Sequence, residues 1–358
     1  MFLEIGIGAA VAILTSVIAC RLLITAGLED APNMARKAHR APTPTSGGLG
    51  IALGFGAGLS VVTLMASEEW RAQVGFWGFT RLSILTAFAC AFLGLGALDD
   101  ARPLGPRLKF AIFAALSVAS VLSTWPVTQL QVGPYVLHLG YVIGLLGSGL
   151  FVFTLVNCVN FMDGLNGLAM GSVSIGLAAL GLIALSEGGL GSASVAFCGA
   201  GALLGFLVWN FPNGRLFAGD SGALFAGALA ALASLHALSR IQLSPFIPPV
   251  LFFPLLADVL LTLAWRVSQK RRVLEGHAEH IYQILNRSGL GAKATTLWYW
   301  FAMVVCGALG FAAAWLELSE VSWGSYAPAA ALALLAAASL IISAMVRNHA
   351  KARKLGEV

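Results

Sequence analysis

Four aspartates mark the places in this sequence where chemistry can occur. Asp99 and Asp100 are adjacent in GALDD, Asp163 lies in NFMDGLNG, and Asp220 lies in GDSG. Only 10% of the residues are charged, so carboxylates beside apolar runs are exceptional here. Carboxylates near several Lys and Arg residues favour a divalent cation and a phosphate-rich ligand, because Mg²⁺ binds one or two carboxylates together with phosphate oxygens.

The elements that must position these aspartates are membrane-spanning helices. The chain has 358 residues, of which 58% are hydrophobic, whereas soluble domains are about 45–50% apolar. Apolar runs near the length that spans a bilayer as a helix, about 20 residues, recur along it. They predict an all-α, polytopic integral membrane protein in which residues 1–358 form a single transmembrane catalytic domain. We expect about eleven transmembrane helices, over residues 2–26, 47–66, 81–98, 109–124, 139–157, 167–186, 194–211, 221–237, 248–266, 294–316 and 326–347.

The distribution of Lys and Arg orients these helices. An odd number of spans places the two termini on opposite sides of the membrane. With the N-terminus outside, only Arg71, Arg81 and Arg240 lie outside, and the other eighteen of the 21 Lys and Arg residues lie on the cytoplasmic side. Positive residues concentrate on the cytoplasmic side of membrane proteins, so the C-terminus is expected there. The net charge of +5 then faces anionic lipids and substrates, and no nucleic-acid partner is needed to explain it.

The cytoplasmic loops of this topology contain nearly all of the unusual polar residues, including the four aspartates. The active-site residues are therefore expected at the cytoplasmic membrane face. Outside, segment 125–141 alternates apolar and polar residues around Gly133 and Pro134, which predicts a small β-hairpin. The five cytoplasmic loops of interest are residues 31–48, 98–110, 157–167, 211–222 and 270–289.

Asp99 and Asp100 are expected at the C-terminal end of a helix, which carries about half a negative charge. Two carboxylates there repel each other and the helix dipole, so a metal ion, Lys109 or Arg107 is needed nearby. Adjacent residues of a helix point about 100° apart, which predicts different roles for the two aspartates. The alternative is that both are merely solvated carboxylates at a helix end.

Other polar residues have a structural interpretation beside a functional one. Asp220 begins a predicted helix and is either an N-cap, for which Asp is well suited, or a metal ligand. Its flanking glycines permit close approach by a ligand or a second backbone. His277 and His280 share one face of a predicted short helix whose apolar stripe suits a membrane surface; they bind a metal ion or a phosphate, or are structural. Asp258, inside a predicted span, is either functional or a contact that fixes helix packing.

Five motifs in order along the chain resemble those of the polyprenyl-phosphate N-acetylhexosamine-1-phosphate transferase family: PTPTSGG, GALDD, NxxNxxDGLNGLA, GDSG and HxxHIYQ. The resemblance covers about residues 30–290. The family includes the bacterial enzymes that initiate O-antigen or enterobacterial common antigen lipids, and the translocase that makes the first lipid intermediate of peptidoglycan. Where that translocase has a run of histidines, this chain has GHAEHIYQ with Tyr282, which favours the O-antigen-initiating branch over a MurNAc-pentapeptide substrate.

The resemblance implies that a sugar-1-phosphate of the N-acetylhexosamine type passes from a UDP-sugar to undecaprenyl phosphate. UMP leaves, and the undecaprenyl-diphospho-sugar formed begins an O-antigen-like surface polysaccharide. The resemblance also implies Mg²⁺ as cofactor, with Mn²⁺ as a substitute, and a multi-pass location in the bacterial inner membrane. The expected partners are UDP-N-acetylhexosamine, undecaprenyl phosphate and membrane lipids. The identity of the sugar and the formation of a homodimer stay open.

The resemblance further assigns roles to residues. Asp220 matches the magnesium-binding aspartate, Asp99 and Asp100 match a catalytic pair, and Lys109 matches a basic position that follows this pair. Asn166 stands where many relatives have Asp, which favours hydrogen bonding over metal binding there. The expected substrate-binding residues are Arg40, Asn157, Asn160, Asp163, Asn166, Arg271, Arg272, His277 and His280.

The mechanism and the function class each have an alternative. Phosphoryl transfer depends on positioning and charge neutralisation, and a phosphate with a second pKa of about 6 is mostly dianionic at neutral pH. Direct in-line attack, with Asp99 orienting the lipid phosphate, is therefore favoured over a covalent aspartyl-phosphate. The alternative class is a membrane transporter or flippase of anionic lipid-linked or nucleotide substrates. Transporters hold polar groups near the bilayer midplane on broken helices, whereas here only Asp258 is expected to lie deep.

Overall fold

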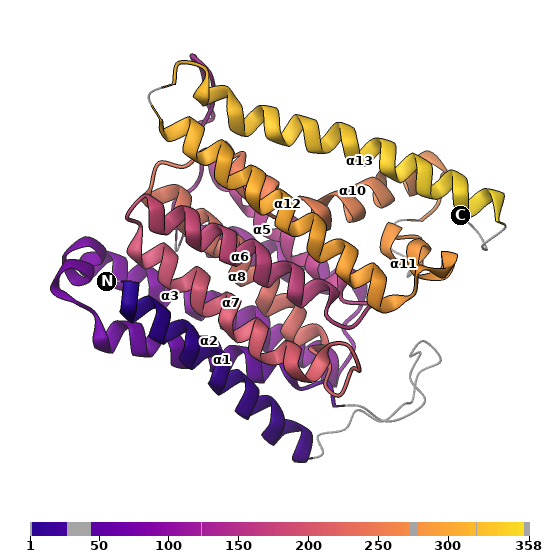
Figure 1. Cartoon of the computed structure of the whole chain (residues 1–358), viewed down its shortest axis with the longest axis horizontal. Helices are drawn as coiled ribbons and strands as arrows, with labels where there is room; N and C mark the ends of the chain where they lie inside the picture. Colours follow the sequence, from indigo (N-terminus) through magenta and orange to yellow (C-terminus); the bar gives the residue numbers. More distant parts are fainter. Residues whose placement is uncertain (1, 27–43, 123, 273–277, 320, 354–358) are drawn as a thin grey trace.

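The structure, a computed structural model, describes residues 2–26, 44–122, 124–272, 278–319 and 321–353. It is a bundle of helices that run roughly alongside one another, with the first helix and the last on opposite flanks (Figure 1). The predicted all-α membrane class is therefore confirmed. The helices are α1 Phe2–Thr25, α2 Gly47–Met65, α3 Glu68–Ala101, α4 Pro106–Val121, α5 Gly140–Met162, α6 Leu168–Ser186, α7 Leu190–Asn210, α8 Gly219–Arg240, α9 Ile247–Leu251, α10 Phe253–Ser268, α11 Ile281–Leu285, α12 Ala292–Leu318 and α13 Ala327–Ala352.

One hairpin interrupts the helical order where the sequence predicts it. Strands β1 Gln129–Val132 and β2 Tyr135–His138 pair antiparallel, with Val132 opposite Tyr135. Gly133 sits in the turn with a φ of 59°, a backbone conformation that glycine adopts without a steric cost. The predicted hairpin is thus confirmed.

Nine helices in the described part of the chain are long and apolar enough to cross a membrane. They coincide with nine of the eleven predicted spans. The predicted span 109–124 corresponds to α4, whose 16 residues are roughly 24 Å long at 1.5 Å per residue. The predicted span 248–266 is interrupted at Phe252, between α9 and α10. The membrane class is shown by these helices, and the number eleven stays a prediction.

Two elements differ from the expectations. α3 begins at Glu68, well before residue 81: the Ser67 hydroxyl caps its first turn by accepting from Trp70 N at 3.3 Å, and the helix is kinked at Gly75, whose φ of 63° is not helical. The prediction that His277 and His280 share one face of a short helix is wrong for His280, because this residue precedes α11. His277 lies outside the described residues.

The apolar stripe of α11 also faces a protein neighbour and not a membrane surface. Ile281 and Ile284 are buried against Val346 and Ala350 of α13. An apolar stripe can be buried equally well by lipid or by another helix. Here it is buried by α13, whose position the local sequence of α11 does not determine.

α8 is the centre of the bundle. Every residue from Ser221 to Ala237 is buried, and α3 and α5 pack along the helix. Small residues permit this packing: a Cβ atom at Gly227 would lie 2.8 Å from the Cα of Val156 on α5. The middle of α8 is enclosed, and its charged residues Asp220 and Arg240 lie at its two ends. The two ends therefore carry the polar chemistry of this helix.

Candidate functional site

Three helix ends bring together predicted site residues that are far apart in the sequence. Asp99 lies at the end of α3, Lys109 lies in the first turn of α4, and Asp220 lies in the first turn of α8. The Lys109 ammonium donates to Asp99 Oδ2 at 2.5 Å and also to Asp220 Oδ2. Lys109 thus provides the cation that was expected near the aspartate pair. Asp99 and Asp220 share this lysine.

Asp100 faces a different partner from Asp99. Its carboxylate accepts from the backbone N–H of Asp220 at 3.0 Å and from that of Ser221 at 3.1 Å. The first N–H groups of a helix have no partner inside the helix, and a negative charge there is stabilised by the helix dipole. Asp99 instead accepts from Leu104 N at 2.7 Å in addition to Lys109. The two aspartates therefore have different contacts, as their helical spacing predicts.

The same contacts decide how α8 is capped. Asp220 makes no side-chain cap, and the residue before the helix is Ala218. The carboxylate of Asp220 is directed at Lys109 and at Asn160, whose Nδ2 donates to Asp220 Oδ1 at 3.1 Å. Because Asp100 caps the helix, the side chain of Asp220 is not needed as a cap.

Glycines make this junction narrow enough for the cap to form. Gly219 has a φ of 69°, and a Cβ atom there would lie 2.7 Å from both Asp100 Oδ2 and the carbonyl oxygen of Thr45. A Cβ atom at Gly48 would lie 2.4 Å from the nitrogen of Gly222. The glycines of GDSG and PTPTSGG thus serve close approach by a second backbone, one of the two uses that the sequence allows.

Backbone hydrogen bonds join the first and fourth of the five loops that are predicted to be cytoplasmic. Phe217 N donates to Pro44 O at 2.9 Å, and Gly47 N donates to Phe217 O at 2.9 Å. The segment before Asp220 is therefore held against the described part of PTPTSGG. Arg40, the predicted substrate residue before this motif, lies outside the described residues.

The loop that follows α5 adds a further carboxylate to the cluster. Asp163 ends this helix and is half-buried. Burial, together with the negative charges of Asp220 and Asp100, raises the pKa of Asp163 to about 7. A cation bound near these groups would offset the repulsion that raises this pKa.

The other two amides of the loop are bonded within the protein. Asn157 is buried, and its Nδ2 donates to Phe153 O at 2.7 Å within α5. Asn166 Nδ2 donates to Pro212 O at 3.1 Å, so it ties this loop to the one before Asp220. The sequence favours a hydrogen-bonding role for Asn166, and in the structure its side chain does form a hydrogen bond, with the backbone of Pro212.

Three residues that the sequence did not single out hold this loop in place. Asn210, at the end of α7, accepts from Gly167 N at 2.6 Å and donates to Leu216 O at 2.8 Å. Thr296 donates to Asn166 O, and Trp300 donates to Gly167 O, each at 3.0 Å. Of these three residues, Asn210 could have been predicted from the sequence, because an amide at the end of an apolar run is buried and needs a hydrogen-bond partner nearby.

The fifth loop forms a second polar cluster. Glu279 is buried and accepts from the guanidinium groups of Arg266 and Arg271, one on each carboxylate oxygen. Arg272 is exposed. His280 is buried, and its Nδ1 lies 3.2 Å from Asp258 Oδ1. These contacts show a scaffold for the loop; substrate binding by Arg271, Arg272 and His280 stays a prediction.

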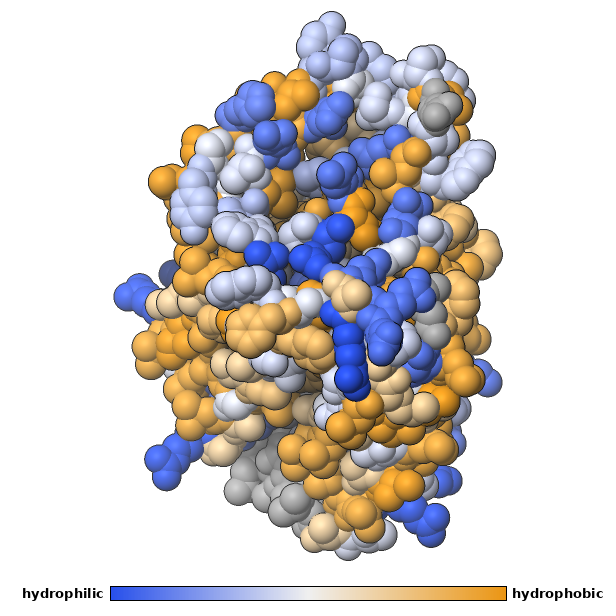
Figure 2. Space-filling model, turned by 90° about the vertical axis from the view of Figure 1, so that its left-hand side faces the viewer, coloured by the Kyte–Doolittle hydropathy of each residue, from blue (hydrophilic) through white to orange (hydrophobic). Residues whose placement is uncertain are grey.

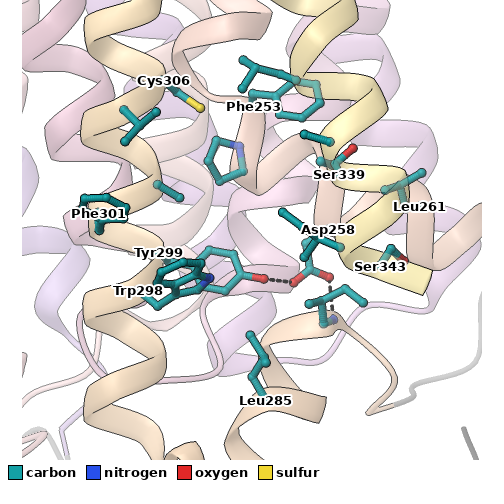
Figure 3. Close-up of a pocket in the computed structure, with 18 residues that line it drawn as sticks. Phe253, Asp258, Leu261, Leu285, Trp298, Tyr299, Phe301, Cys306, Ser339 and Ser343 are labelled. Atoms are coloured by element: carbon teal, nitrogen blue, oxygen red, sulfur yellow. Dashed lines mark hydrogen bonds between the residues drawn. The ribbon is translucent and has the colours of Figure 1, made fainter. Parts of the chain in front are cut away.

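Asp258 has many donors. It accepts from Ile281 N at 2.9 Å, from Tyr282 N at 3.0 Å and from the Tyr299 hydroxyl at 2.5 Å, in addition to His280. Figure 3 shows the Tyr299 hydroxyl directed at this carboxylate. Of the two interpretations open from the sequence, the geometry supports a contact that fixes packing: Asp258 anchors the start of α11 to α10.

Tyr282 connects the two clusters. Its hydroxyl donates to Phe161 O at 3.1 Å, and a Cβ atom at Gly164 would lie 2.2 Å from the same hydroxyl oxygen. The fifth loop is therefore a direct neighbour of the loop that carries Asp163. All the predicted site residues that the structure describes lie on this one end of the bundle.

Known proteins are similar to this chain in sequence. Residues 82–238 match the model of glycosyl transferase family 4. A decaprenyl-phosphate N-acetylglucosaminephosphotransferase of Mycobacterium tuberculosis is 30% identical over 302 residues, which cover 76% of this chain and 73% of that protein. The chain belongs to glycosyltransferase family 4, the polyprenyl-phosphate N-acetylhexosamine-1-phosphate transferases.

Other members of family 4 match a similar share of the chain. A probable undecaprenyl-phosphate N-acetylglucosaminyl 1-phosphate transferase of Bacillus subtilis is 29% identical over 282 residues, 77% of this chain and 75% of that protein. A phospho-N-acetylmuramoyl-pentapeptide-transferase of Moorella thermoacetica is 28% identical over 276 residues, 76% of this chain and 84% of that protein. The family resemblance seen in the motifs is confirmed.

The donor set of this family 4 chain fits Mg²⁺ better than a softer metal. The side chains around Asp220 offer carboxylate and amide oxygens, from Asp99, Asp163 and Asn160, and Mg²⁺ prefers oxygen ligands. Among the described residues, no group of three or more His, Cys, Asp or Glu side chains is arranged to hold a metal ion by itself. Asp220 is the residue that would hold the ion.

An apolar pocket of about 250 Å³ lies beside the fifth loop, between α10, α12 and α13. Figure 3 shows Phe253 and Leu261 on one side and Phe301 and Cys306 on another, with Asp258 on the wall. The pocket suits a hydrocarbon chain, because apart from Asp258 and a few hydroxyls its lining is apolar.

Proposed function

We propose that this family 4 member is a Mg²⁺-dependent transferase that moves N-acetylhexosamine-1-phosphate from a UDP-sugar to undecaprenyl phosphate. The observation that carries the proposal is the junction at which Lys109 contacts both Asp99 and Asp220, next to Asn160. A carboxylate that is free of capping duty, an ammonium and an amide at one membrane face are suited to a diphosphate and its cation.

The reaction exchanges one phosphoanhydride bond, in the UDP-sugar, for another, in the lipid-linked diphosphate. An oxygen of the lipid phosphate bonds to the phosphorus that carries the sugar, and the bond from this phosphorus to the oxygen that bridges to the uridine phosphate breaks. UMP leaves with the electron pair. Because a lipid phosphate with a second pKa of about 6 is already mostly dianionic at neutral pH, no strong base is required. In-line attack is therefore proposed, without a covalent aspartyl-phosphate.

The chain contributes positioning and charge. Asp99, held by Leu104 N and Lys109, orients the lipid phosphate, and Lys109 offsets negative charge between the two substrates. Asn160 and Asp163 face the nucleotide-sugar from the end of α5. When bound at Asp220, Mg²⁺ supplies electrostatic stabilisation of the phosphate groups.

The apolar pocket beside Asp258 supports an acceptor with a hydrocarbon chain. It lies between membrane helices, and α11 links its wall to the loop of Asp163 through Tyr282. A polyprenyl chain in this pocket would have its phosphate near the site end of the bundle. The M. tuberculosis and B. subtilis relatives are named for decaprenyl and undecaprenyl phosphate.

We propose an N-acetylhexosamine other than MurNAc-pentapeptide as the sugar, and an O-antigen-like polysaccharide as the product pathway. The support is the motif HIYQ, in which Tyr282 is buried against Gly164. This motif stands where the resemblance places a run of histidines in the peptidoglycan translocase, and that difference favours a sugar without the peptide.

A transporter or flippase is the second candidate class. It would need polar groups along a path through the bundle. Among the described residues, Asp258 is the carboxylate whose predicted depth in the membrane suggested such a path. Its carboxylate is already hydrogen-bonded within the protein, to His280, Ile281, Tyr282 and Tyr299, and it anchors α11. The site geometry therefore favours the enzyme.

The test is release of UMP by the purified full-length chain. The protein is incubated with undecaprenyl phosphate, Mg²⁺ and each of several UDP-N-acetylhexosamines, with EDTA as the control. We expect UMP and a lipid-linked sugar in equal amounts from at least one UDP-sugar, and neither in EDTA. Uptake of lipid-linked or nucleotide substrate into vesicles without UMP would establish the transporter instead.

A further inference from the structure

The end of the bundle opposite the aspartate cluster holds a second pocket, which has a partly polar lining. It has a volume of about 90 Å³ and lies where α3 begins, α7 begins and α8 ends. The 22 residues of α8 place it roughly 33 Å from Asp220 at 1.5 Å per residue. Figure 2 views the end of the bundle at which α1 begins, and hydrophilic side chains gather across the middle of this end.

A buried histidine on the wall of this pocket lacks a partner. His236 is 2% exposed, and its Nδ1 lies 2.8 Å from the hydroxyl oxygen of Ser192, which is also buried. Its Nε2 has no hydrogen bond within the described residues. If the serine hydroxyl donates to Nδ1, the ring hydrogen is on Nε2, and a buried donor without an acceptor is costly. A hydrogen-bond acceptor placed at Nε2 would therefore remove this cost.

Backbone donors lie on the same wall. α7, with 21 residues, begins at Leu190, and Gln73 Oε1 accepts from the Leu190 N–H at 3.0 Å. In the described part of the chain, the N–H groups of Gly191 and Ser192 have no acceptor, and both residues line the pocket. The beginning of a helix carries about half a positive charge, which favours an anion.

Two guanidinium groups complete a positive environment. Arg240 lines the pocket and donates to Gln73 O at 3.0 Å. The charges of Arg81 and Arg240 act on each other and on His236. Glu187 also lines the pocket, but it is exposed and accepts from the Ser186 hydroxyl at 3.4 Å. Two of the three Lys and Arg residues predicted to lie outside thus act on this part of the molecule: Arg240 lines the pocket, and Arg81 acts on it through its charge without lining it.

We propose that this pocket binds a phosphate group at the membrane face opposite the catalytic cluster, with His236 Nε2, Arg240 and the first N–H groups of α7 as its donors. Sites for drug-sized ligands measure about 300–1,000 Å³, so this pocket holds a single compact oxyanion and excludes a nucleotide-sugar. The phosphate belongs either to the headgroup of a bilayer lipid or to free inorganic phosphate. The site is independent of the proposed transferase activity.

The test compares variants of the full-length chain in detergent, prepared without phosphate. Arg240→Gln removes one donor and leaves the buried Ser192–His236 pair intact, and His236→Phe removes the orphan nitrogen. Arg71→Gln is the matched control, since Arg71 is an exposed arginine predicted on the same face that does not line the pocket. ³¹P relaxation reports binding of inorganic phosphate, and native mass spectrometry reports retention of phosphatidylglycerol.

We expect the wild type and Arg71→Gln to bind one of the two probes and Arg240→Gln to bind it about tenfold more weakly, the loss expected for one hydrogen bond to a charged group. Binding of inorganic phosphate identifies the free ion, and retention of phosphatidylglycerol alone identifies a lipid headgroup. Equal behaviour of Arg240→Gln and Arg71→Gln with both probes overturns the proposal. UMP release, measured in parallel, is expected to be unchanged in all three variants.

Discussion

Single residues decide the charge balance of the site. Lys109 is partly buried between Asp99 and Asp220, so each carboxylate has a cation whichever substrate is bound. Asn160 adds a neutral donor to Asp220, and Asp100 is removed from this balance because two backbone N–H groups engage it. The functions of the four carboxylates are therefore separable by substitution.

Asp220→Asn is expected to reduce UMP release by at least about a hundredfold, because the amide lacks the charge that holds Mg²⁺. Its melting temperature should stay close to that of the wild type, since Asp100 and not Asp220 caps α8. Turnover and thermal unfolding of the same preparation provide the measurement. Turnover near the wild-type value over a range of Mg²⁺ concentrations would remove Asp220 from metal binding.

Asp99→Asn is expected to lower turnover roughly tenfold if Asp99 orients an ionised phosphate, whereas general-base duty typically contributes about 10²–10⁴-fold. Binding of the UDP-sugar, measured by calorimetry, should survive. Asp100→Asn is the comparison: it keeps one oxygen acceptor for α8 and should mainly lower the melting temperature. Loss of nucleotide binding in Asp99→Asn would contradict this division of roles.

Asp163 predicts a pH dependence. Its pKa of about 7 in the folded protein exceeds the ordinary value of 3.8, so the folded state retains a proton that the unfolded state loses between these values. The free energy of unfolding due to this group therefore falls as pH rises from about 4 to 7 and is level above that. A cation prefers the ionised carboxylate, so stabilisation by Mg²⁺ should increase between pH 6 and pH 8. Thermal unfolding with and without Mg²⁺ measures this increase, and Asp163→Asn should remove most of it.

At the scale of elements, the site is a meeting of helix ends. The end of α3 places Asp100 at the start of α8, and the start of α4 places Lys109 between them. α11 is anchored in the same way, by Asp258 of α10. A carboxylate from one helix that caps another fixes the relative position of both, and in this chain such caps are made by residues distant in sequence.

Gly219→Ala should disturb this junction. The φ of 69° costs a non-glycine residue about 1–3 kcal/mol, and the new Cβ would lie 2.7 Å from Asp100 Oδ2. Both the melting temperature and turnover should fall. Gly56→Ala is the matched control, because a Cβ atom there meets nothing within 4 Å. Equal effects of the two substitutions would show that the junction tolerates displacement.

At the scale of the whole molecule, the bundle has two chemically different ends. α8 is enclosed over its length, with Asp220 at one end and Arg240 at the other. The positive residues counted along the chain predict that the Asp220 end faces the cytoplasm. This orientation gives the site access to a soluble nucleotide-sugar.

The orientation is tested by labelling in intact cells with a membrane-impermeant thiol reagent. In a cysteine-free background, a cysteine added after Val358 should stay unlabelled, because the tail is predicted to be cytoplasmic. Tyr135→Cys, on the exposed hairpin strand β2, should be labelled, because this hairpin is predicted outside. Labelling in the reverse pattern would place the catalytic cluster on the outer face and make a cytoplasmic UDP-sugar inaccessible to it.

Much of the candidate site was predictable from sequence. Asp99, Lys109, Asp163 and Asp220 are polar residues in an apolar chain, and the loop order places them on one side of the membrane. The different contacts of Asp99 and Asp100 follow from helical geometry alone. The hairpin around Gly133 follows from strand alternation and turn residues, which are local properties.

The sequence by itself determined the membrane class, the hairpin and the set of polar residues that meet, because span length, alternation and composition are read within short stretches. Only the tertiary structure decided which carboxylate caps which helix. Asp100 and Ser221 are 121 residues apart, and Asp258 and Ile281 are 23 apart. An aspartate at a helix end can coordinate a metal ion, or it can accept hydrogen bonds from a lysine or from the N–H groups of another helix. Its partner therefore depends on which helix ends the packing of the bundle brings together.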